Sequence, residues 1–204
     1  MKTPIGENWC QNHLADKTLY ALLKKSDEDL VELARRKGCG HCPHGKLHRA
    51  DYRRKPRGMN CWPKDPKDTK RFSLCCDREG CRRRHTPPSV RFLGRRVYGG
   101  VVAVLFPAMV HGLTPSRVDQ IRKALDLPID RRTLERWRQW WLGLFVGSSF
   151  WNAARARFLP PLCQKTLPLS LCLKFEVERR DRLLDLLLFL APITTPQAWK
   201  ELVM

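Results

Sequence analysis

Cys39-Gly-His-Cys42 and Cys76-Asp-Arg-Glu-Gly-Cys81 are two short cysteine clusters that decide the fold expected for this chain. Two cysteines separated by two residues form a tight knuckle whose backbone amides point at the sulfurs, and a second knuckle facing the first completes a tetrahedral thiolate site. Because the thiols ionise when they bind a metal, metal binding and local folding are one event. The segment between the clusters has room for one hairpin, so the sequence predicts a small metal-built β module.

We expect Cys39, Cys42, Cys76 and Cys81 to be the four ligands, although Cys75 stands beside Cys76 and could take its place. Other side chains of the same segment could replace a thiolate: His41, His44, His48, His85 and Cys61. Zinc suits thiolates in a reducing compartment, although the iron of a rubredoxin-like site has the same ligands. A fourth thiolate leaves no open position for water, which favours a structural role for the metal.

The charge of the chain favours a polyanionic partner. Among 204 residues, 39 Lys and Arg stand against 20 Asp and Glu, which gives a formal net charge of +19 and a pI near 10.1. Each phosphate that a protein neutralises releases condensed counterions, so a surplus of this size favours nucleic acid. An anionic membrane surface is the minor competitor.

The cysteines are expected to be reduced. Residues 1–16 are polar and lack the apolar stretch of a signal peptide, which predicts a cytoplasmic protein with metal-bound and free thiols. Cys10, Cys163 and Cys172 are then ordinary small residues. The apolar runs Val97–Val110 and Leu183–Leu190 are too short to span a bilayer, so no membrane partner is expected.

Much of the positive charge lies in or next to the cysteine segment. The forked guanidinium group of arginine can donate two hydrogen bonds to phosphate oxygens or to the edge of a guanine. A rigid hairpin held by a metal would fix the direction of these side chains. The residues expected to contact nucleic acid here are Arg53, Arg54, Lys55, Arg57, Arg82, Arg83, Arg84, Arg91, Arg95 and Arg96.

Outside the cysteine segment the chain is expected to be helical. Leucines recur at helical spacing in 17–25 and 27–37, with Ser26 or Asp27 as a cap between two short helices. The predicted units are N-terminal helices (1–37), a zinc-ribbon module (38–89), a basic linker (90–96), a helix-turn-helix domain (97–146) and C-terminal helices (147–204). The predicted fold class is mainly α with a small zinc-ribbon β element.

The helix-turn-helix prediction depends on capping. After a helix over 97–111, Thr114-Pro115 begins a second helix, and Asp130 caps a third over 131–144. Leu134, Trp137 and Trp141 would anchor the third helix. Its outer face would read DNA with Arg131, Arg132, Thr133, Arg136 and Gln139. A plain basic helix of a bundle is the alternative.

C-terminal to that helix, two more helices are expected over 148–158 and 176–190, separated by a proline-broken loop. The leucines of 183–190 are hydrophobic beyond one stripe, so they form core or the surface of a homodimer.

Three segments resemble the N-terminal DNA-binding regions of bacterial insertion-sequence transposases. They are Cys39-Gly-His-Cys42, Phe72-Ser-Leu-Cys-Cys-Asp-Arg-Glu-Gly-Cys81-Arg-Arg-Arg-His-Thr-Pro-Pro, and Arg132-Thr-Leu-Glu-Arg-Trp-Arg-Gln-Trp-Trp141, and together they cover about residues 39 to 142. In that family a zinc ribbon precedes a helix-turn-helix that docks on the terminal repeats of the element. The resemblance implies the same arrangement here, in a protein associated with the bacterial nucleoid.

One departure from the family is important. Those transposases continue into an RNase H-like domain whose three carboxylates hold two metal ions. Only about sixty residues follow Trp141 here, and Glu178, Asp181 and Asp185 alternate with arginines as on a salt-bridged helix face. We therefore expect no strand-transfer chemistry.

The sequence thus favours a non-catalytic, zinc-containing protein that binds double-stranded DNA at specific sites, as an accessory or regulatory factor of a mobile element. A recombinase or another mobile-element protein would be its protein partner. The enzymatic alternative is a small nuclease of the His-metal finger type, which would recruit His48, Asp51, Asn60 and His85. An RNA-binding ribonucleoprotein subunit is the third interpretation.

Overall fold

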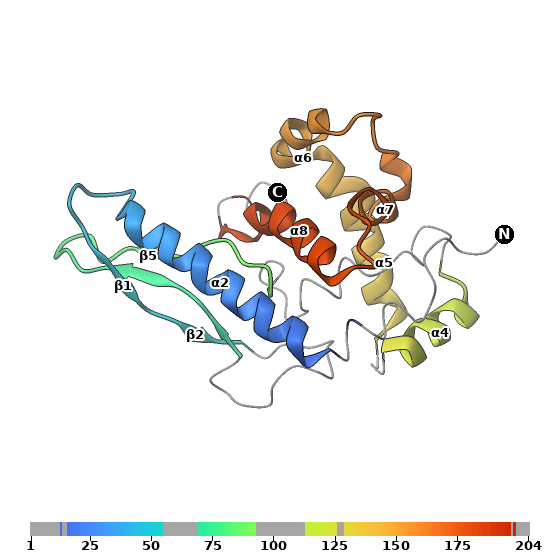
Figure 1. The fold of residues 1–204 in the computed structure, drawn as a ribbon, viewed down its shortest axis with the longest axis horizontal. Coiled ribbons are helices and arrows are strands. Elements are labelled where there is room, and N and C mark those ends of the chain that lie inside the picture. Colours follow the sequence, from blue (N-terminus) through green and yellow to red (C-terminus); the bar gives the residue numbers. More distant parts are fainter. Residues whose placement is uncertain are drawn as a thin grey trace.

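One long helix lies along the side of the β structure. The computed structural model describes residues 13, 16–54, 69–92, 113–125, 129–196 and 198, and its first complete element is helix α2 (Lys17–Lys37; Figure 1). The Asp16 carboxylate caps the helix by accepting a hydrogen bond from the Thr18 N–H at 2.8 Å. The helix ends at Gly38, whose φ of 75° is in the region that favours glycine.

The prediction of two short helices in this segment is wrong. Ser26 and Asp27 lie inside α2, where the Ser26 hydroxyl donates to the Leu22 carbonyl at 3.0 Å instead of capping a new helix. Asp27 is buried and its carboxylate is used by residues far away in the sequence, as described below.

The β structure is one long antiparallel hairpin with a third strand beside it. The strands are β1 (Leu47–Arg49), β2 (Tyr52–Arg53), β3 (Lys70–Arg71), β4 (Leu74–Cys76) and β5 (Arg84–His85). β1, β4 and β5 form one sheet in that order, and β2 pairs with β3. Tyr52 opposes Arg71 in the same register in which Arg49 opposes Leu74, so 47–53 and 70–76 form one continuous ladder. Its middle is held by the Ala50 N–H, which donates to the Ser73 carbonyl at 2.8 Å.

The remaining elements are helical (Figure 1). They are α4 (Pro115–Leu125), α5 (Arg131–Gln139), a π-helix that continues α5 (Trp140–Phe145), α6 (Ser149–Ala154), α7 (Leu169–Phe175), α8 (Arg180–Leu190) and 3-10 turns at Arg155–Arg157, Gln164–Thr166 and Ala191–Thr194. A mainly helical chain with a small β element is therefore confirmed. Pro115 begins α4 and Asp130 caps α5, both as predicted. α7 lies in a segment predicted to be a loop, and the helix predicted over 97–111 lies outside the described residues.

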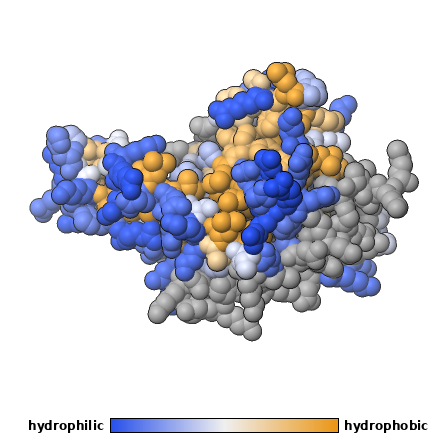
Figure 2. Space-filling model, viewed as in Figure 1, coloured by the Kyte–Doolittle hydropathy of each residue, from blue (hydrophilic) through white to orange (hydrophobic). Residues whose placement is uncertain are grey.

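Two hydrophobic cores are present, and α2 contributes to both. The larger core is built by the C-terminal helices around Trp141, Phe145 and Trp151, and it includes Leu19 and Leu23 from the first half of α2. The smaller core lies between the second half of α2 and the hairpin, and it contains Val31, Leu47, Phe72, Leu74 and Cys76. The hydrophilic end of the molecule in Figure 2 is the β structure with the second half of α2, whereas hydrophobic side chains gather over the C-terminal helices.

A buried polar network connects α2 to the segment that follows β5. Asp27 accepts hydrogen bonds from the Ser89 hydroxyl at 2.7 Å, from the Val90 N–H at 2.7 Å and from the Arg91 guanidinium at 2.8 Å. Val90 and Phe92 are buried in the larger core. The interpretation of 90–96 as a linker is therefore wrong for 90–92, because these residues are packed inside the molecule.

In the described parts of the chain, no helix combines the length and the apolar character that crossing a bilayer requires.

Candidate metal centre and nucleic-acid interface

The four predicted cysteines come together at the end of the hairpin. Their sulfur atoms all lie within 4.8 Å of one another. The Cys39 and Cys81 sulfurs are 3.8 Å apart, and those of Cys42 and Cys76 are 3.5 Å apart. The first knuckle precedes β1, and the second connects β4 to β5, so strand pairing brings the two together. The arrangement could hold a metal ion.

A glycine that the sequence analysis did not single out makes this approach possible. A Cβ atom on Gly45 would lie 2.6 Å from the Cys76 sulfur and 2.7 Å from the Cys42 sulfur, closer than such atoms can come. The Gly45 carbonyl also accepts a hydrogen bond from the Cys39 N–H at 3.1 Å. Glycine close to a cysteine pair is a weak signal in one sequence, because Gly40 lies as near in the chain and has open space around it.

The choice between Cys75 and Cys76 follows from strand alternation. Cys76 opposes Leu47 and is buried, whereas Cys75 opposes His48 and lies on the other face of the sheet. The Cys75 sulfur donates to the Arg82 carbonyl at 3.3 Å and is not part of the cluster.

None of the described histidines takes part in the four-sulfur cluster either. The His41 ring lies 3.2 Å from the Arg83 guanidinium, and the His48 ring lies 3.2 Å from the Asp77 carboxylate. Cys61 lies outside the described residues.

Proximity and burial change the pKa values of three of these thiols. Hydrogen bonds from the backbone of His41 and Cys42 lower the pKa of the Cys39 thiol to about 7. Burial and the neighbouring sulfurs raise the pKa of the Cys42 thiol to about 12, and burial also raises the pKa of Cys76. One thiolate forms easily in such a group, and further negative charge needs a cation among the sulfurs.

The cationic side chains expected to meet nucleic acid fall into two groups. Arg53, Arg82, Arg83 and Arg84 are exposed, and Arg54 is half-buried beside Tyr52. Lys55, Arg57, Arg95 and Arg96 lie outside the described residues.

Arg91 does not belong to the interface, and its assignment to nucleic acid is wrong. Its side chain has no exposed surface, and its guanidinium pairs with Asp27 while donating to the Tyr20 hydroxyl at 3.1 Å and to the Lys70 carbonyl at 3.1 Å. A phosphate cannot reach a guanidinium that is enclosed in this way.

On α5, Arg131, Arg132, Arg136 and Gln139 are exposed as expected. Thr133 is a correction, because it is 7% exposed and packs beside Leu134 and Trp137. Its hydroxyl accepts a hydrogen bond from the Arg136 guanidinium at 3.0 Å, so it orients an arginine instead of facing a partner.

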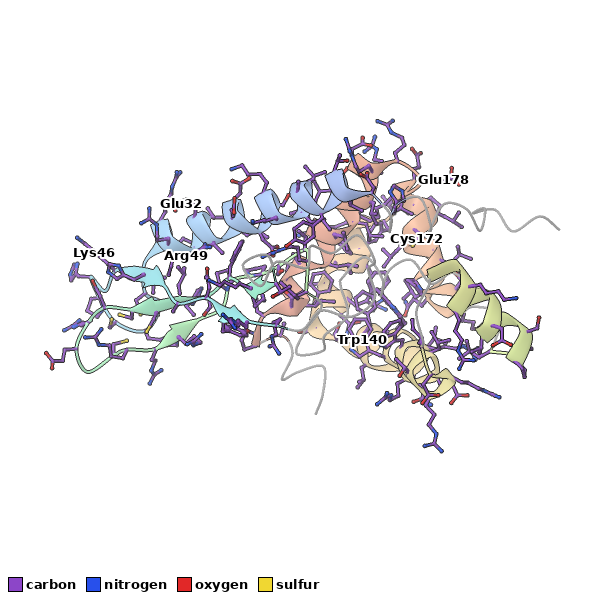
Figure 3. The ribbon with its side chains drawn as sticks, turned by 90° about the horizontal axis from the view of Figure 1, so that it is seen from below. Glu32, Lys46, Arg49, Trp140, Cys172 and Glu178 are labelled. Atoms are coloured by element: carbon purple, nitrogen blue, oxygen red, sulfur yellow. The ribbon has the colours of Figure 1, made fainter. Side chains whose placement is uncertain are left out.

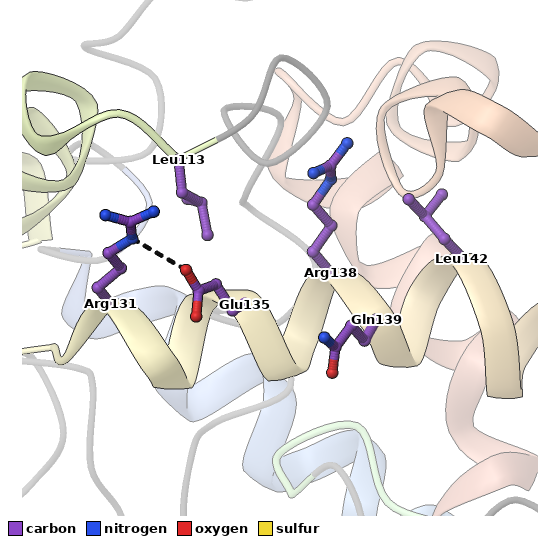
Figure 4. A pocket seen from close by; sticks show the side chains of 6 residues that line it. All are labelled: Leu113, Arg131, Glu135, Arg138, Gln139 and Leu142. Carbon is purple, nitrogen blue, oxygen red and sulfur yellow. Dashed lines mark hydrogen bonds and ion pairs between the residues drawn. The ribbon is translucent and has the colours of Figure 1, made fainter.

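Two open hollows flank the exposed face of α5. One has a volume of about 450 Å³ and is lined by Leu113, Arg131, Glu135, Arg138, Gln139 and Leu142 (Figure 4). The second, also about 450 Å³, is lined by Asp130, Arg132, Glu135, Arg136 and Gln139. In the first, Arg131 is paired with Glu135 at 2.9 Å, and the buried Nε of Arg138 makes no hydrogen bond. Within the part of the chain that the structure describes, both sides of α5 are therefore accessible to a binding partner.

Among the described residues that a nuclease would recruit, the two histidines lie on opposite faces of the sheet. His48 lies on the face of the sheet that carries Cys75, whereas His85 opposes Leu74 on the other face. The Asp51 carboxylate accepts from the Ser73 N–H at 3.0 Å and pairs with Arg49 at 3.1 Å. Asn60 lies outside the described residues.

Two of the three acidic residues expected on a salt-bridged face, Asp181 and Asp185, form ion pairs. Asp181 pairs with Arg179 at 2.8 Å, and Asp185 pairs with Arg182 at 3.5 Å. Among the described residues, the four cysteines form the one group of three or more side chains suited to a metal ion.

Comparison with family models, with curated proteins and with solved structures finds no match to this chain.

Proposed function

We propose that the chain is a non-catalytic DNA-binding protein in which a zinc ribbon and helix α5 grip one duplex. Four thiolates about 2.3 Å from a tetrahedral Zn²⁺ are separated from one another by about 3.8 Å, and the observed sulfur distances of 3.8 and 3.5 Å fit this arrangement. Bound zinc would neutralise the thiolates and fix the two knuckles. The metal is structural, because the four sulfurs fill its coordination sphere.

One observation carries the proposal. Arg82, Arg83 and Arg84 follow the last cysteine ligand, are exposed, and form no ion pair with any described carboxylate. Other exposed arginines of the chain do have carboxylate partners, since Arg35 is paired with Glu32 at 2.9 Å and Arg131 with Glu135 at 2.9 Å. Positive charge that is held on a rigid knuckle and left uncompensated favours a phosphate backbone.

Helix α5 supplies the sequence-reading part of the proposal. Arg132 and Arg136 are one turn apart on its exposed face and likewise form no ion pair with a described carboxylate. The Arg136 guanidinium is oriented by Thr133 and by the Arg132 carbonyl, at 3.0 and 3.3 Å. Site specificity and a role beside a mobile element, with a recombinase as partner, follow from the family resemblance and remain part of the proposal.

The test begins with selection of duplexes from a random pool by the zinc-loaded protein, followed by affinity measurements on the selected and scrambled sequences. Arg132→Ala should lower the ratio of the two affinities by about tenfold or more, because one bidentate base contact is lost. Arg83→Ala should weaken both duplexes alike and reduce the salt slope by about 0.9. An equal loss on both duplexes with Arg132→Ala would overturn the role of α5.

Two other outcomes would replace the proposal. Structured RNA that displaces duplex DNA at equal concentration would favour a ribonucleoprotein subunit. Nicking of plasmid with magnesium or manganese, abolished by His48→Ala, would make the chain a nuclease.

A further inference from the structure

One carboxylate interrupts the basic face of α5. Glu135 is the one acidic residue of the sequence between Asp130 and Glu176. Its neighbours on the exposed face of α5 are arginines, at positions 131, 132 and 136. A carboxylate close to phosphates weakens the attraction of a basic surface for nucleic acid. General affinity for a polyanion therefore does not account for Glu135.

The stability of the helix is also a weak reason for this residue. The Nε of Arg131 donates to Oε1 of Glu135 at 2.9 Å, across one turn of α5. Such a pair stabilises a helix most when the acidic residue precedes the basic one, and here Arg131 precedes Glu135. The two side chains are 55% and 42% exposed, and an ion pair so open to solvent contributes little.

Glu135 stands on a ridge between the two hollows of α5. Glu135 and Gln139, which are one turn apart, line both hollows. In Figure 4, Arg138 and Gln139 point to different sides of the helix. The ridge thus carries a carboxylate and an amide, and positive charge lies on both of its flanks. On the flanks, Arg131 and Arg138 line the first hollow, and Arg132 and Arg136 line the second.

This distribution of side chains suits a major groove. A helix that enters the groove has base edges in front of it and a phosphate backbone on each side. From the flanks, arginine side chains can reach the phosphates or the bases beside the ridge, whereas Glu135 on the ridge faces the bases. A carboxylate accepts hydrogen bonds and donates none, so the base edge suited to it is the N4 amino group of cytosine.

The Glu135 carboxylate can still accept such a hydrogen bond. Arg131 uses Oε1, and no described residue donates a hydrogen bond to Oε2. An ionised carboxylate has about four lone-pair sites, so a base can bind while Arg131 holds the side chain in place. Holding the carboxylate in advance lowers the entropy that binding would cost.

We infer that Glu135 is a further sequence-reading residue of α5, which accepts a hydrogen bond from the amino group of a cytosine in the major groove. The inference rests on the proposed function. It adds a base preference that the arginines of α5 cannot supply, because a guanidinium donates hydrogen bonds and accepts none.

The experiment compares the duplexes that the full zinc-loaded protein and its variants select from a random pool. The unmodified protein should select cytosine at one position where Glu135→Gln no longer does. Adenine should replace cytosine there, because an amide pairs with N6 and N7 of adenine. Glu135→Ala should accept any base at this position, and its affinity for the original selected duplex should fall about tenfold, as for one mismatched base pair.

Glu32→Gln is the matched control for the loss of one negative charge. Glu32 is paired with Arg35 at 2.9 Å and is 42% exposed, the same distance and exposed fraction as for Glu135, and it also pairs with Arg36 at 3.4 Å. Figure 3 shows Glu32 on α2, away from Trp140, which directly follows α5. Glu32→Gln should change the affinity for all duplexes alike and leave the selected sequence unchanged.

Arg131→Ala separates base reading by Glu135 from an effect through its ion pair. Cytosine should remain selected in Arg131→Ala, because the carboxylate is still present on the ridge. If Arg131→Ala loses the same cytosine as Glu135→Gln, Glu135 only positions Arg131 and its assignment as a reader is wrong. Circular dichroism of each variant would identify one that fails to fold, and Glu135→Ala provides a second test of the same side chain.

The two levels of proposal fail differently. An identical selected sequence for Glu135→Gln and for the unmodified protein would overturn the role of Glu135 and leave the DNA-binding proposal standing. If the unmodified protein binds no duplex at low salt, the proposed function is wrong and the inference fails with it.

Discussion

Asp27 and Arg91, which are 64 residues apart in the chain, form an ion pair of 2.8 Å in which the two side chains are 1% and 0% exposed. The Asp27 carboxylate has no other charged partner among the described hydrogen bonds, and it accepts from Ser89 and from the Val90 N–H as well. Arg91 in turn lies over the Phe72 ring, 4.4 Å from its centre. This pair therefore connects α2, the hairpin and the chain that leaves it.

Removing Asp27 should destabilise the protein strongly. Asp27→Ala leaves a buried guanidinium without its counter-charge, and we expect the free energy of unfolding to fall by about 3–5 kcal/mol. Urea denaturation at pH 7 would measure the change. Asp29→Ala is the matched control on the same helix, because Asp29 is 64% exposed and its pair with Lys25 should contribute little. Equal effects of the two substitutions would contradict this account of the buried pair.

Gly45→Ala should weaken metal binding, whereas Gly40→Ala should not. The added methyl group of Gly45→Ala would overlap two ligand sulfurs, and the same group at Gly40 meets nothing within 4 Å. We expect a loss of about 10–100-fold in zinc affinity for Gly45→Ala, the range seen for changes beside metal ligands. Competition with a chromogenic chelator would give both affinities. Unchanged affinity in Gly45→Ala would show that the cluster does not close as described.

The adjacent cysteines Cys75 and Cys76 offer an internal comparison. Cys75→Ser should retain about one zinc per chain, because its sulfur lies outside the cluster, whereas Cys76→Ser removes a ligand. Since metal binding and folding of the module are coupled, Cys76→Ser should also lose the near-ultraviolet signal of the module. Metal analysis after dialysis checks the first expectation and circular dichroism the second. Loss of zinc from Cys75→Ser alone would reverse the ligand assignment.

The cap of α2 should make part of the stability depend on pH. The hydroxyl of Thr18 lowers the pKa of the Asp16 carboxyl below its ordinary value, helped by the backbone N–H groups of Thr18 and Leu19 and by Arg180. A carboxyl with a lowered pKa stabilises the fold fully at neutral pH, and this contribution is lost as the pH falls below about 4 through the folded-state value.

Asp16→Ala should therefore cost about 1 kcal/mol at pH 7. The difference from the unmodified protein should shrink at pH 3, because the carboxyl takes up protons as the pH falls and a protonated carboxyl is a weaker cap. Asp16→Asn keeps an acceptor for the Thr18 N–H and should remove the pH dependence while retaining most of the stability. Urea denaturation of all three proteins at pH 7 and pH 3 is the measurement, and a constant difference for Asp16→Ala would contradict the assignment.

The metal cluster could be predicted from the sequence because its signal is local. The turn geometry of each knuckle follows from a few neighbouring residues. Once Leu47 and Leu74 are recognised as core, the alternation of side chains along a strand places Cys76 on the core face and Cys75 on the opposite face. The periodicity of a helix would likewise have placed Thr133 on the buried face, since Thr133 precedes the buried Trp137 by four residues. The hydroxyl of Thr133 had suggested a contact with DNA, whereas the four-residue spacing to Trp137 places the residue in the core.

The buried network could not be predicted in the same way. From its neighbours in the sequence, Asp27 resembles a helix cap and Arg91 resembles a residue of a basic linker. Only the tertiary fold brings the two side chains together. A charged residue is exposed by default, so a buried pair 64 residues apart gives no sign in the local pattern of either segment. Gly45 was missed for a related reason, because the atoms that exclude a side chain there come from both knuckles.

Helix α2 acts as a rigid strut. Leu19 and Leu23 pack among the C-terminal helices and Val31 packs against the hairpin, so one continuous helix connects the two cores. Tandem DNA-binding units joined by flexible linkers tolerate changes in the distance between their two half-sites. Under the proposed function, a protein built on one strut cannot adapt in this way, and inserting half a helical turn between the two proposed DNA contacts would place them on opposite sides of the duplex. The fixed length of α2 would thus make binding depend on the helical phase between the two contact sites on the DNA.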